Sequence, residues 1–553
     1  MNILKNISYF GFSTFLSRIL GYLRDTLIAV FLGTSAVADA LFVAFRIPNT
    51  FRSLFAEGSF NSAFIPAYTK QKGGKKNHFA NQVLNLLIIF ILFIVFVIEI
   101  FTPEFLFLIS PGFKDIDGKF DLAVDLSRIT IPFLFFISIA SFLSAILNSK
   151  GKFLITAAAP IILNILLIIS LVFFNNTHTE IVYASSYALT IAGVIQVIFL
   201  FFFAKKYFKI NLSFIINVNN QVKSFFGKLL PSVFASGVNQ INILIGTIIA
   251  SFESGAVSYL YYADRIYQLP LALTGIAIAT VILPSLSKQV FKSKLVKVNF
   301  IQNRSLELCL FLSLPATIGI FLASDEIISA LYGYGFFDAE SVMNTSAALL
   351  LFGIGLPAFG LIKIYSSFYF ARSNTKFPFY LSLFSVILNI SISLTLFKSY
   401  GFIIIPLATS VSAWLTVVVY QLNLIKSGYH FGAKLTKIMV SADVISWALV
   451  LALPIHFTLA IYYFPKTEIN IISWLAFLYV AIFSQWIGFF AWYKGLDIGG
   501  AVRVSQIQLL MPFFTFAFSI YLLGETLDFL TIIFSIAIIL LIYLSRKMVI
   551  TKK

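Results

Sequence analysis

Apolar windows follow one another along almost the whole chain, from residue 7 to residue 545, with short polar breaks between them. A helix that crosses a bilayer needs about 20 mostly apolar residues, because the hydrocarbon core is about 30 Å thick. Many windows of this length are typical of spanning helices rather than of the buried core of a soluble protein. The pattern therefore predicts an all-α polytopic membrane protein with no room for a soluble domain.

The windows divide into two sets and a tail. The first set predicts helices over 7–31, 36–68, 83–108, 121–148, 153–174 and 182–205, and the second over 227–252, 255–285, 304–323, 342–372, 377–398 and 402–427. Four further windows follow, over 440–463, 470–493, 500–523 and 526–545, which gives about 16 spans in total. We expect a six-helix lobe over 1–210, a second six-helix lobe over 211–438 and a four-helix tail over 439–553.

Short motifs recur in the two sets at a nearly constant offset. Arg46-Ile47 in the first set matches Arg265-Ile266 in the second, 219 positions later, and each is followed by a proline and a Lys-Gln pair. The run IILNI (161–165) matches VILNI (386–390), 225 positions later. Because each set has an even number of spans, both copies enter the membrane in the same direction. This predicts parallel repeats about an axis along the membrane normal, with a cavity between two lobes.

The charges fit a membrane protein better than a nucleic-acid-binding protein. The mean hydropathy is +0.96, and the net charge of +17 comes from Lys and Arg residues in alternate short loops. Basic loops such as 70–76, 426–437 and 546–553 alternate with loops poor in Lys and Arg, such as 175–180 and 523–528. Positive loops face the cytoplasm. We therefore expect both termini in the cytoplasm and no nucleic-acid partner.

Enzymatic and metal motifs are missing from the sequence. Cys309 is the single cysteine, so it can form no disulfide within the chain, and the four histidines are too scattered to form a metal site with it. The sequence has no HExxH, GxSxG or Walker A motif. We expect no metal, no cofactor, and neither a hydrolase nor an ATP-driven pump.

Charged residues interrupt the apolar windows between Ser17 and Lys70. A charged side chain at mid-bilayer costs about 2.5–3.5 kcal/mol on insertion scales, so each must face protein, water or a charged ligand. The arginines of this stretch outnumber its acids by one. Its charged residues are Arg18, Arg24, Asp25, Asp39, Arg46, Arg52 and Glu57.

The second set carries its own charged face. Tyr261, Asp264, Arg265 and Gln268 follow helical spacing, and Pro270 after them is expected to kink the helix. We expect Pro48 to interrupt the second helix in the same way, because kinks of this kind line cavities in transporters.

Arginines from both lobes would suit a phosphate ligand. Guanidinium groups bind phosphate oxygens in bidentate geometry, so Arg24, Arg52 and Arg265 would suit a diphosphate. In the alternative reading, Arg24 pairs with Asp25, Arg46 with Asp39 and Arg265 with Asp264, and these pairs only neutralise one another. For Asn164 and Asn389 we expect hydrogen bonds between helices.

Several segments carry a family resemblance. They are SRILGYLRD (17–25), ADALFVAFRIPNTFRSLFAEGSFNSAFIP (38–66), LNSKGKF (147–153), YYADRIYQLPLALTGIAIATVILPSLSK (261–288) and FYFARSNTKFP (368–378). Over residues 1 to about 438 the chain resembles the MurJ (MviN) family of lipid II flippases. The resemblance implies a transporter that moves the undecaprenyl-diphosphate-linked peptidoglycan precursor outward across the bacterial inner membrane.

The resemblance also implies a site. Its cavity arginines correspond to Arg24, Arg52 and Arg265, and Asp25, Asp39, Arg18, Arg46 and Glu57 complete the substrate-binding set. Some members are thought to bind sodium in the second lobe. Asn389 and Thr409 match that site, but Ser393 stands where a carboxylate is expected. Lipid II and membrane lipids are the partners that we expect, for a monomer.

The tail departs from this family. Residues 444–464, 474–514 and 522–547 resemble the last four helices of an EamA-type drug/metabolite transporter. The chain therefore looks like a fusion, either natural or produced by the joining of two genes. Two other functions stay open: export of another polyprenyl-linked glycan or amphiphile, and a non-functional fusion protein.

Overall fold

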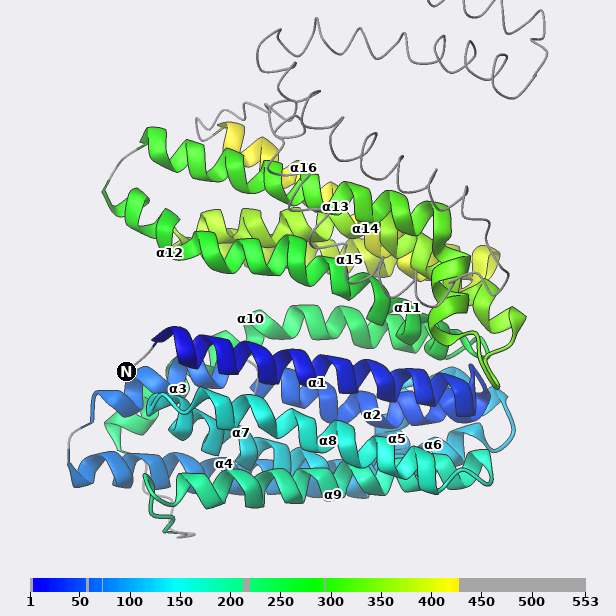
Figure 1. The fold of residues 1–553 in the computed structure, drawn as a ribbon, viewed down its shortest axis with the longest axis horizontal. Coiled ribbons are helices and arrows are strands. Elements are labelled where there is room, and N and C mark those ends of the chain that lie inside the picture. The colour runs from blue at the N-terminus through cyan, green and yellow to red at the C-terminus, as the bar shows by residue number, and fades with distance from the viewer. Residues whose placement is uncertain (1–2, 56–58, 72, 212–218, 293–294, 427–553) are drawn as a thin grey trace, which may run out of the picture. The chain divides into compact units, whose positions relative to one another are not determined.

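The computed structural model describes residues 3–426, except for 56–58, 72, 212–218 and 293–294. The predicted tail and Glu57 lie outside the described residues. The described part of the chain is built of helices and contains no strand (Figure 1). Eight of its helical segments are long and apolar enough to cross a membrane. The predicted all-helical membrane class is confirmed.

The first set of helices follows the predicted windows closely. Three windows are each divided between two elements: 36–68 between α2 and α3, 83–108 between α4 and α5, and 121–148 between α6 and α7. Figure 1 shows α7, α8 and α9 side by side, and these helices pack against one another. The elements are α1 (Ile3–Leu32), α2 (Ala36–Phe55), α3 (Ser59–Thr69), α4 (Gly74–Ile100), α5 (Thr102–Ile109), η1 (Pro111–Asp115), α6 (Lys119–Thr130), α7 (Phe133–Ser149), α8 (Phe153–Phe173) and α9 (His178–Ala204).

The second set differs most at α13, which begins before the predicted window 304–323. The non-helical backbone of Ala323 kinks it at the predicted end, and a further helical stretch runs on to Tyr332. Arg304 pairs with Glu307 one turn later, at 3.6 Å, so a charge that looked like a break lies on the surface of the part of α13 before this kink. The elements are α10 (Asn220–Ala250), α11 (Ala256–Leu271), η2 (Ala272–Ile276), α12 (Ala277–Phe291), α13 (Leu295–Tyr332), α14 (Ala339–Phe370), α15 (Lys376–Tyr400), η3 (Gly401–Ile403) and α16 (Ile404–Lys426).

The two prolines behave differently. Helix α2 remains helical through Pro48 to Phe55, so the expected interruption there is wrong. Pro270 is followed directly by the π-helical turn η2, which connects α11 to α12. A proline inside a helix removes one hydrogen bond, and a π-turn is a local departure from α-helical bonding, so the helix is irregular at the place where the sequence predicts a kink.

The chain forms two compact units, Met1–Ala433 and Lys434–Lys553, and the described residues belong to the first. Helix α10 takes part in two different packing regions of this unit. Its beginning packs in a core with α3 and α4, where Phe225 contacts Phe60, Phe64 and Phe79. Its last turns contact α15, with which it shares a hydrogen bond described below.

Candidate functional site

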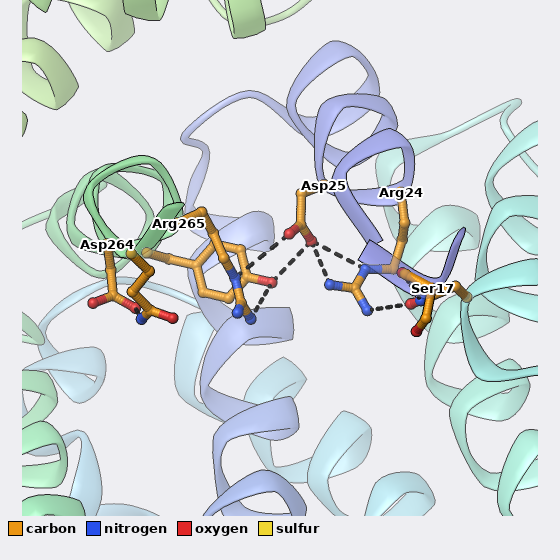
Figure 2. Close-up of polar contacts among 8 residues, drawn as sticks. Ser17, Arg24, Asp25, Asp264 and Arg265 are labelled. Carbon is orange, nitrogen blue, oxygen red and sulfur yellow. Dashed lines mark hydrogen bonds and ion pairs between the residues drawn. The ribbon is translucent and has the colours of Figure 1, made fainter. Parts of the chain in front are cut away.

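Asp25 lies between two arginines that come from two different helices, α1 and α11 (Figure 2). On α1, the Nε and Nη2 atoms of Arg24 donate to Asp25 Oδ1 at 3.0 and 2.6 Å. From α11, Arg265 Nε lies 3.4 Å from Asp25 Oδ2. One carboxylate thus holds two guanidinium groups whose residues are 241 positions apart in the sequence.

Tyr261 completes this arrangement. Its hydroxyl donates to Asp25 Oδ1 at 3.0 Å and accepts from Arg265 Nη2 at 3.1 Å. The Arg265 guanidinium also lies over the Tyr261 ring, 4.7 Å from its centroid. The same ring stacks on Phe42 of α2 at a centroid distance of 3.9 Å. We call Arg24, Asp25, Tyr261 and Arg265 the arginine cluster.

Asn164 on α8 contacts the Arg24 guanidinium of the cluster. Its Oδ1 accepts from Arg24 Nη1 at 2.9 Å, and its Nδ2 donates to the main-chain carbonyl of Ser17 at 2.9 Å (Figure 2). The hydrogen bonds between helices that the sequence predicts for Asn164 are present.

The arginine cluster can bind an anion. Its two guanidinium groups and single carboxylate leave one positive charge in excess. The Asp25 side chain is 5% exposed, whereas that of Arg265 is 39% exposed. Charge-assisted N–H donors of arginine are strong partners for carboxylate and phosphate oxygens. A ligand with two or more anionic oxygens could therefore take the place of the Asp25 carboxylate.

The remaining predicted residues lie elsewhere. Arg46 is half-buried on α2, in the electrostatic field of Asp264 and Arg265, and Arg52 Nε donates to Asn49 Oδ1 at 3.4 Å. Arg18 is exposed on α1. The described contacts thus bring Arg24, Asp25 and Arg265 together, and Glu57 is outside the described residues.

Asp39 is part of a second cluster. It is fully buried and pairs with Lys119 of α6 at 2.7 Å, so the alternative pairing of Arg46 with Asp39 is wrong. At the start of α11, Gly255 N, Ser258 N and Ser258 Oγ also donate to Asp39, at 2.9, 2.9 and 2.6 Å. Sequence reasoning missed Lys119, although a lysine at the start of an apolar helix was a signal that its charge needs a partner.

Two further hydrogen bonds join the end of α1 and the residue after it to distant parts of the chain. Phe336 N donates to the Val30 carbonyl at 2.9 Å, and the Tyr262 hydroxyl donates to the Gly33 carbonyl at 3.2 Å. Gly33 has φ +57°, and a Cβ there would lie 2.2 Å from the Phe336 carbonyl oxygen. Only glycine fits such a position. We use the name junction for this set of contacting residues: Val30, Gly33, Asp39, Lys119, Gly255, Ser258, Tyr262 and Phe336.

The suggested sodium residues form hydrogen bonds with one another and with Asn242. Asn389 Nδ2 donates to Asn242 Oδ1 at 2.7 Å and to Thr409 Oγ1 at 3.2 Å, so the hydrogen bonds expected between helices are present here too. Ser393 donates to Asn389 Oδ1 at 3.2 Å. In the described residues, no group of three His, Cys, Asp or Glu side chains could hold a metal ion.

Comparison with known proteins decides the family. A model described as "Lipid II flippase MurJ" matches residues 28–485. The chain belongs to the MurJ family. A second model, the EamA-like transporter family, matches residues 427–546 and confirms the resemblance of the tail. The two matches overlap over residues 427–485.

Curated relatives agree. A Rickettsia prowazekii (strain Madrid E) protein named "Probable lipid II flippase MurJ" is 38% identical over 448 residues, 80% of this chain and 86% of the relative. A MurJ relative from Rhizobium tropici is 37% identical over 440 residues, 78% of this chain and 82% of the relative.

Solved structures agree as well. The structure titled "Lipid II flippase MurJ, inward closed conformation" is 29% identical, has a TM-score of 0.70, and is matched over 89% of this chain and 99% of its own. An inward-facing MATE-family transporter of the MOP superfamily has a TM-score of 0.60 at 16% identity, over 74% of this chain and 94% of its own. At 16% identity, the similarity to the MATE-family transporter shows a shared fold and nothing more.

Proposed function

We propose that this MurJ-family chain is a flippase of the bacterial inner membrane. It moves lipid II, the undecaprenyl-diphosphate-linked peptidoglycan precursor, to the outer face by alternating access. The observation that carries the proposal is the Asp25 carboxylate held between Arg24 and Arg265. A diphosphate offers several anionic oxygens for the same donors and can compete with one carboxylate. Family membership and relatives named as lipid II flippases support the substrate.

Two parallel six-helix lobes, 1–210 and 211–438, are part of the proposal. Asp39 contacts Ser258, 219 positions later, and Phe42 stacks on Tyr261 at the same offset. This is also the offset between Arg46 and Arg265. Residues at equivalent positions can contact each other only close to the axis that relates two repeats. These contacts support a pseudo-two-fold axis between α2 and α11, and the tail brings the expected total to about 16 spans.

The junction is the outward gate in this proposal. The loop over 175–180 and the segment 252–255, on the junction side, carry no Lys or Arg. Basic residues such as Lys70, Lys150 and Arg372 lie at the opposite ends of their helices, as cytoplasmic residues do. With the junction closed, the cluster is reached from the cytoplasm, and both chain termini lie there.

The transport cycle follows from these two clusters. The diphosphate enters from the cytoplasm and replaces Asp25 at Arg24 and Arg265, while the lipid chain stays in the bilayer. The contact that Asp25 makes between the two lobes is then broken. The lobes can rock apart at the junction, and the headgroup leaves on the outer side. The chain works as a monomer in this account.

Replacement of the arginines tests the site. Arg24→Ala, Arg52→Ala and Arg265→Ala should each abolish growth of a bacterium depleted of its own flippase, with the protein still in the membrane. Lys at the same positions should rescue only partly, because an ammonium group is a point charge without the arginine fork. Arg304→Ala, on the exposed face of α13, is the control and should grow normally.

The outcomes separate the alternatives. Wild-type growth with all three arginines replaced by Ala would refute the proposed substrate-binding site. If the unaltered chain fails to support growth but exports another polyprenyl-linked glycan, the substrate is that glycan. Failure in both assays would make the chain a non-functional fusion.

A further inference from the structure

Asn164 and Asn389 occupy equivalent positions in the two repeats. Each is the asparagine of an Ile-Leu-Asn-Ile run, and each is 6% exposed. Each donates its amide to a residue 147 positions earlier: Asn164 to the Ser17 carbonyl, and Asn389 to the Asn242 side chain. The repeat has therefore kept one asparagine bridge in both copies, from α8 to α1 and from α15 to α10.

The two bridges differ in what else they touch. Asn164 also accepts from Arg24 Nη1 at 2.9 Å. The residue that corresponds to Arg24 in the second repeat, 225 positions later, is Ile249, which has no polar side chain. Asn389 contacts only uncharged side chains among its described partners, namely Asn242, Ser393 and Thr409. The same bridge thus holds an arginine in one repeat only.

Both polar atoms of the Asn164 amide are already used within the protein. Oδ1 binds Arg24 and Nδ2 binds the Ser17 carbonyl. The side chain is therefore suited to hold Arg24 rather than to contact a substrate. Asp25 holds Nε and Nη2 of the same guanidinium, whereas Asn164 holds Nη1.

We infer that Asn164 is a positioning residue for substrate binding. When an anionic headgroup displaces Asp25, the bonds at Nε and Nη2 pass to the ligand, and the bond at Nη1 keeps the guanidinium aimed at it. Without this contact, the long Arg24 side chain would be free to move before binding and would lose conformational entropy when the headgroup binds. The affinity for the headgroup would therefore fall. This inference rests on the proposed function.

Binding of purified lipid II to the full chain in lipid nanodiscs tests the inference. Asn164→Ala should weaken binding about ten- to a hundredfold, the range expected for one hydrogen bond to a charged group. Asn389→Ala, the matched control in the other repeat, should change binding less than about twofold, because it holds no arginine. In an Arg24→Ala background, Asn164→Ala should cause no further loss.

The double substitution separates a positioning role from a structural one. If Asn164→Ala weakens binding equally with and without Arg24, or if Asn389→Ala is as harmful, the asparagine only stabilises the helices and the inference is wrong. If Arg24→Ala itself binds lipid II normally, the proposed site fails instead. Asn164→Ser, too short to reach Arg24, is measured in the same way if the alanine variant does not accumulate.

Discussion

The buried pair of Asp39 and Lys119 should set how tightly the junction is closed. Both side chains have no exposed surface, and Asp39 also binds three donors at the start of α11. Lys119 lies on α6, which packs against the helix α2 that carries Asp39, whereas Gly255 and Ser258 lie at the start of α11. When the junction opens, Asp39 loses the donors of α11 but keeps its lysine.

Lys119→Met should favour the open junction. The substitution leaves a buried carboxylate that only the main-chain and hydroxyl donors of α11 compensate. Removing one partner of a buried pair costs about 3–5 kcal/mol. This cost falls on the closed junction, because an open junction lets water reach Asp39. The ratio of open to closed molecules should rise by roughly 150- to 4,000-fold.

Labelling of a cysteine in the junction measures this shift. Ala256 at the start of α11 is fully buried, so Ala256→Cys in a Cys309→Ser background reports the opening of the junction to an impermeant thiol reagent added outside the cell. Lys119→Met should accelerate labelling strongly. Lys114→Met is the matched control, since Lys114 is exposed and contacts only the rings of Phe107 and Phe120 among its described contacts. It should leave the rate unchanged.

The double variant decides whether the charge is the cause. Asp39→Asn with Lys119→Met removes both charges and should return labelling close to the rate of the parent protein. Labelling that is unchanged in the single variant would refute the reasoning. Equal labelling in the single and double variants would show that lost packing, and not the unpaired charge, opens the junction.

Two further predictions concern the junction and the tail. Gly33→Ala should also accelerate labelling of Ala256→Cys, because it adds a Cβ against the Phe336 carbonyl. Gly73→Ala is the control: Gly73 also has a positive φ, +56°, but a Cβ there would have nothing within 4 Å, so labelling should not change. Equal labelling rates in the two variants would contradict this prediction. A chain that ends at residue 438 should still insert into the membrane, because Met1–Ala433 is a compact unit by itself. When it carries Ala256→Cys, this cysteine should be labelled at the same rate as in the full chain. Loss of the protein from the membrane on truncation would show that the tail is needed for folding.

The helices could be predicted from the sequence because apolar windows record the membrane directly. Windows such as 153–174 and 377–398 agree with α8 and α15 to within two residues at each end. The failures have local causes. Arg304 was taken as a break, but its partner Glu307 lies one helical turn away and keeps the charge on the helix surface. Pro48 was taken as an interruption, although α2 continues through it.

The site was predictable only in part. Arg24 and Asp25 are neighbours, and Arg265 was indicated by its own charge in an apolar helix. Their partners come from distant helices, and a single sequence does not show which charges meet. Lys119 is 80 positions from Asp39, and Asn164 is 140 positions from Arg24. The contacts of both residues depend on the packing of α6 and α8 against α1 and α2, which no local pattern specifies.

Direct measurement of lipid II export tests the central claim. Cells depleted of their own flippase and expressing this chain are treated with an externally added enzyme that cleaves lipid II at its diphosphate, and the cleaved fraction is measured. The account predicts that the full chain restores cleavage and that Arg265→Ala, present in the membrane in equal amount, does not. Cleavage that stays at the depleted level with the unaltered chain, or that is equal with Arg265→Ala, would contradict it.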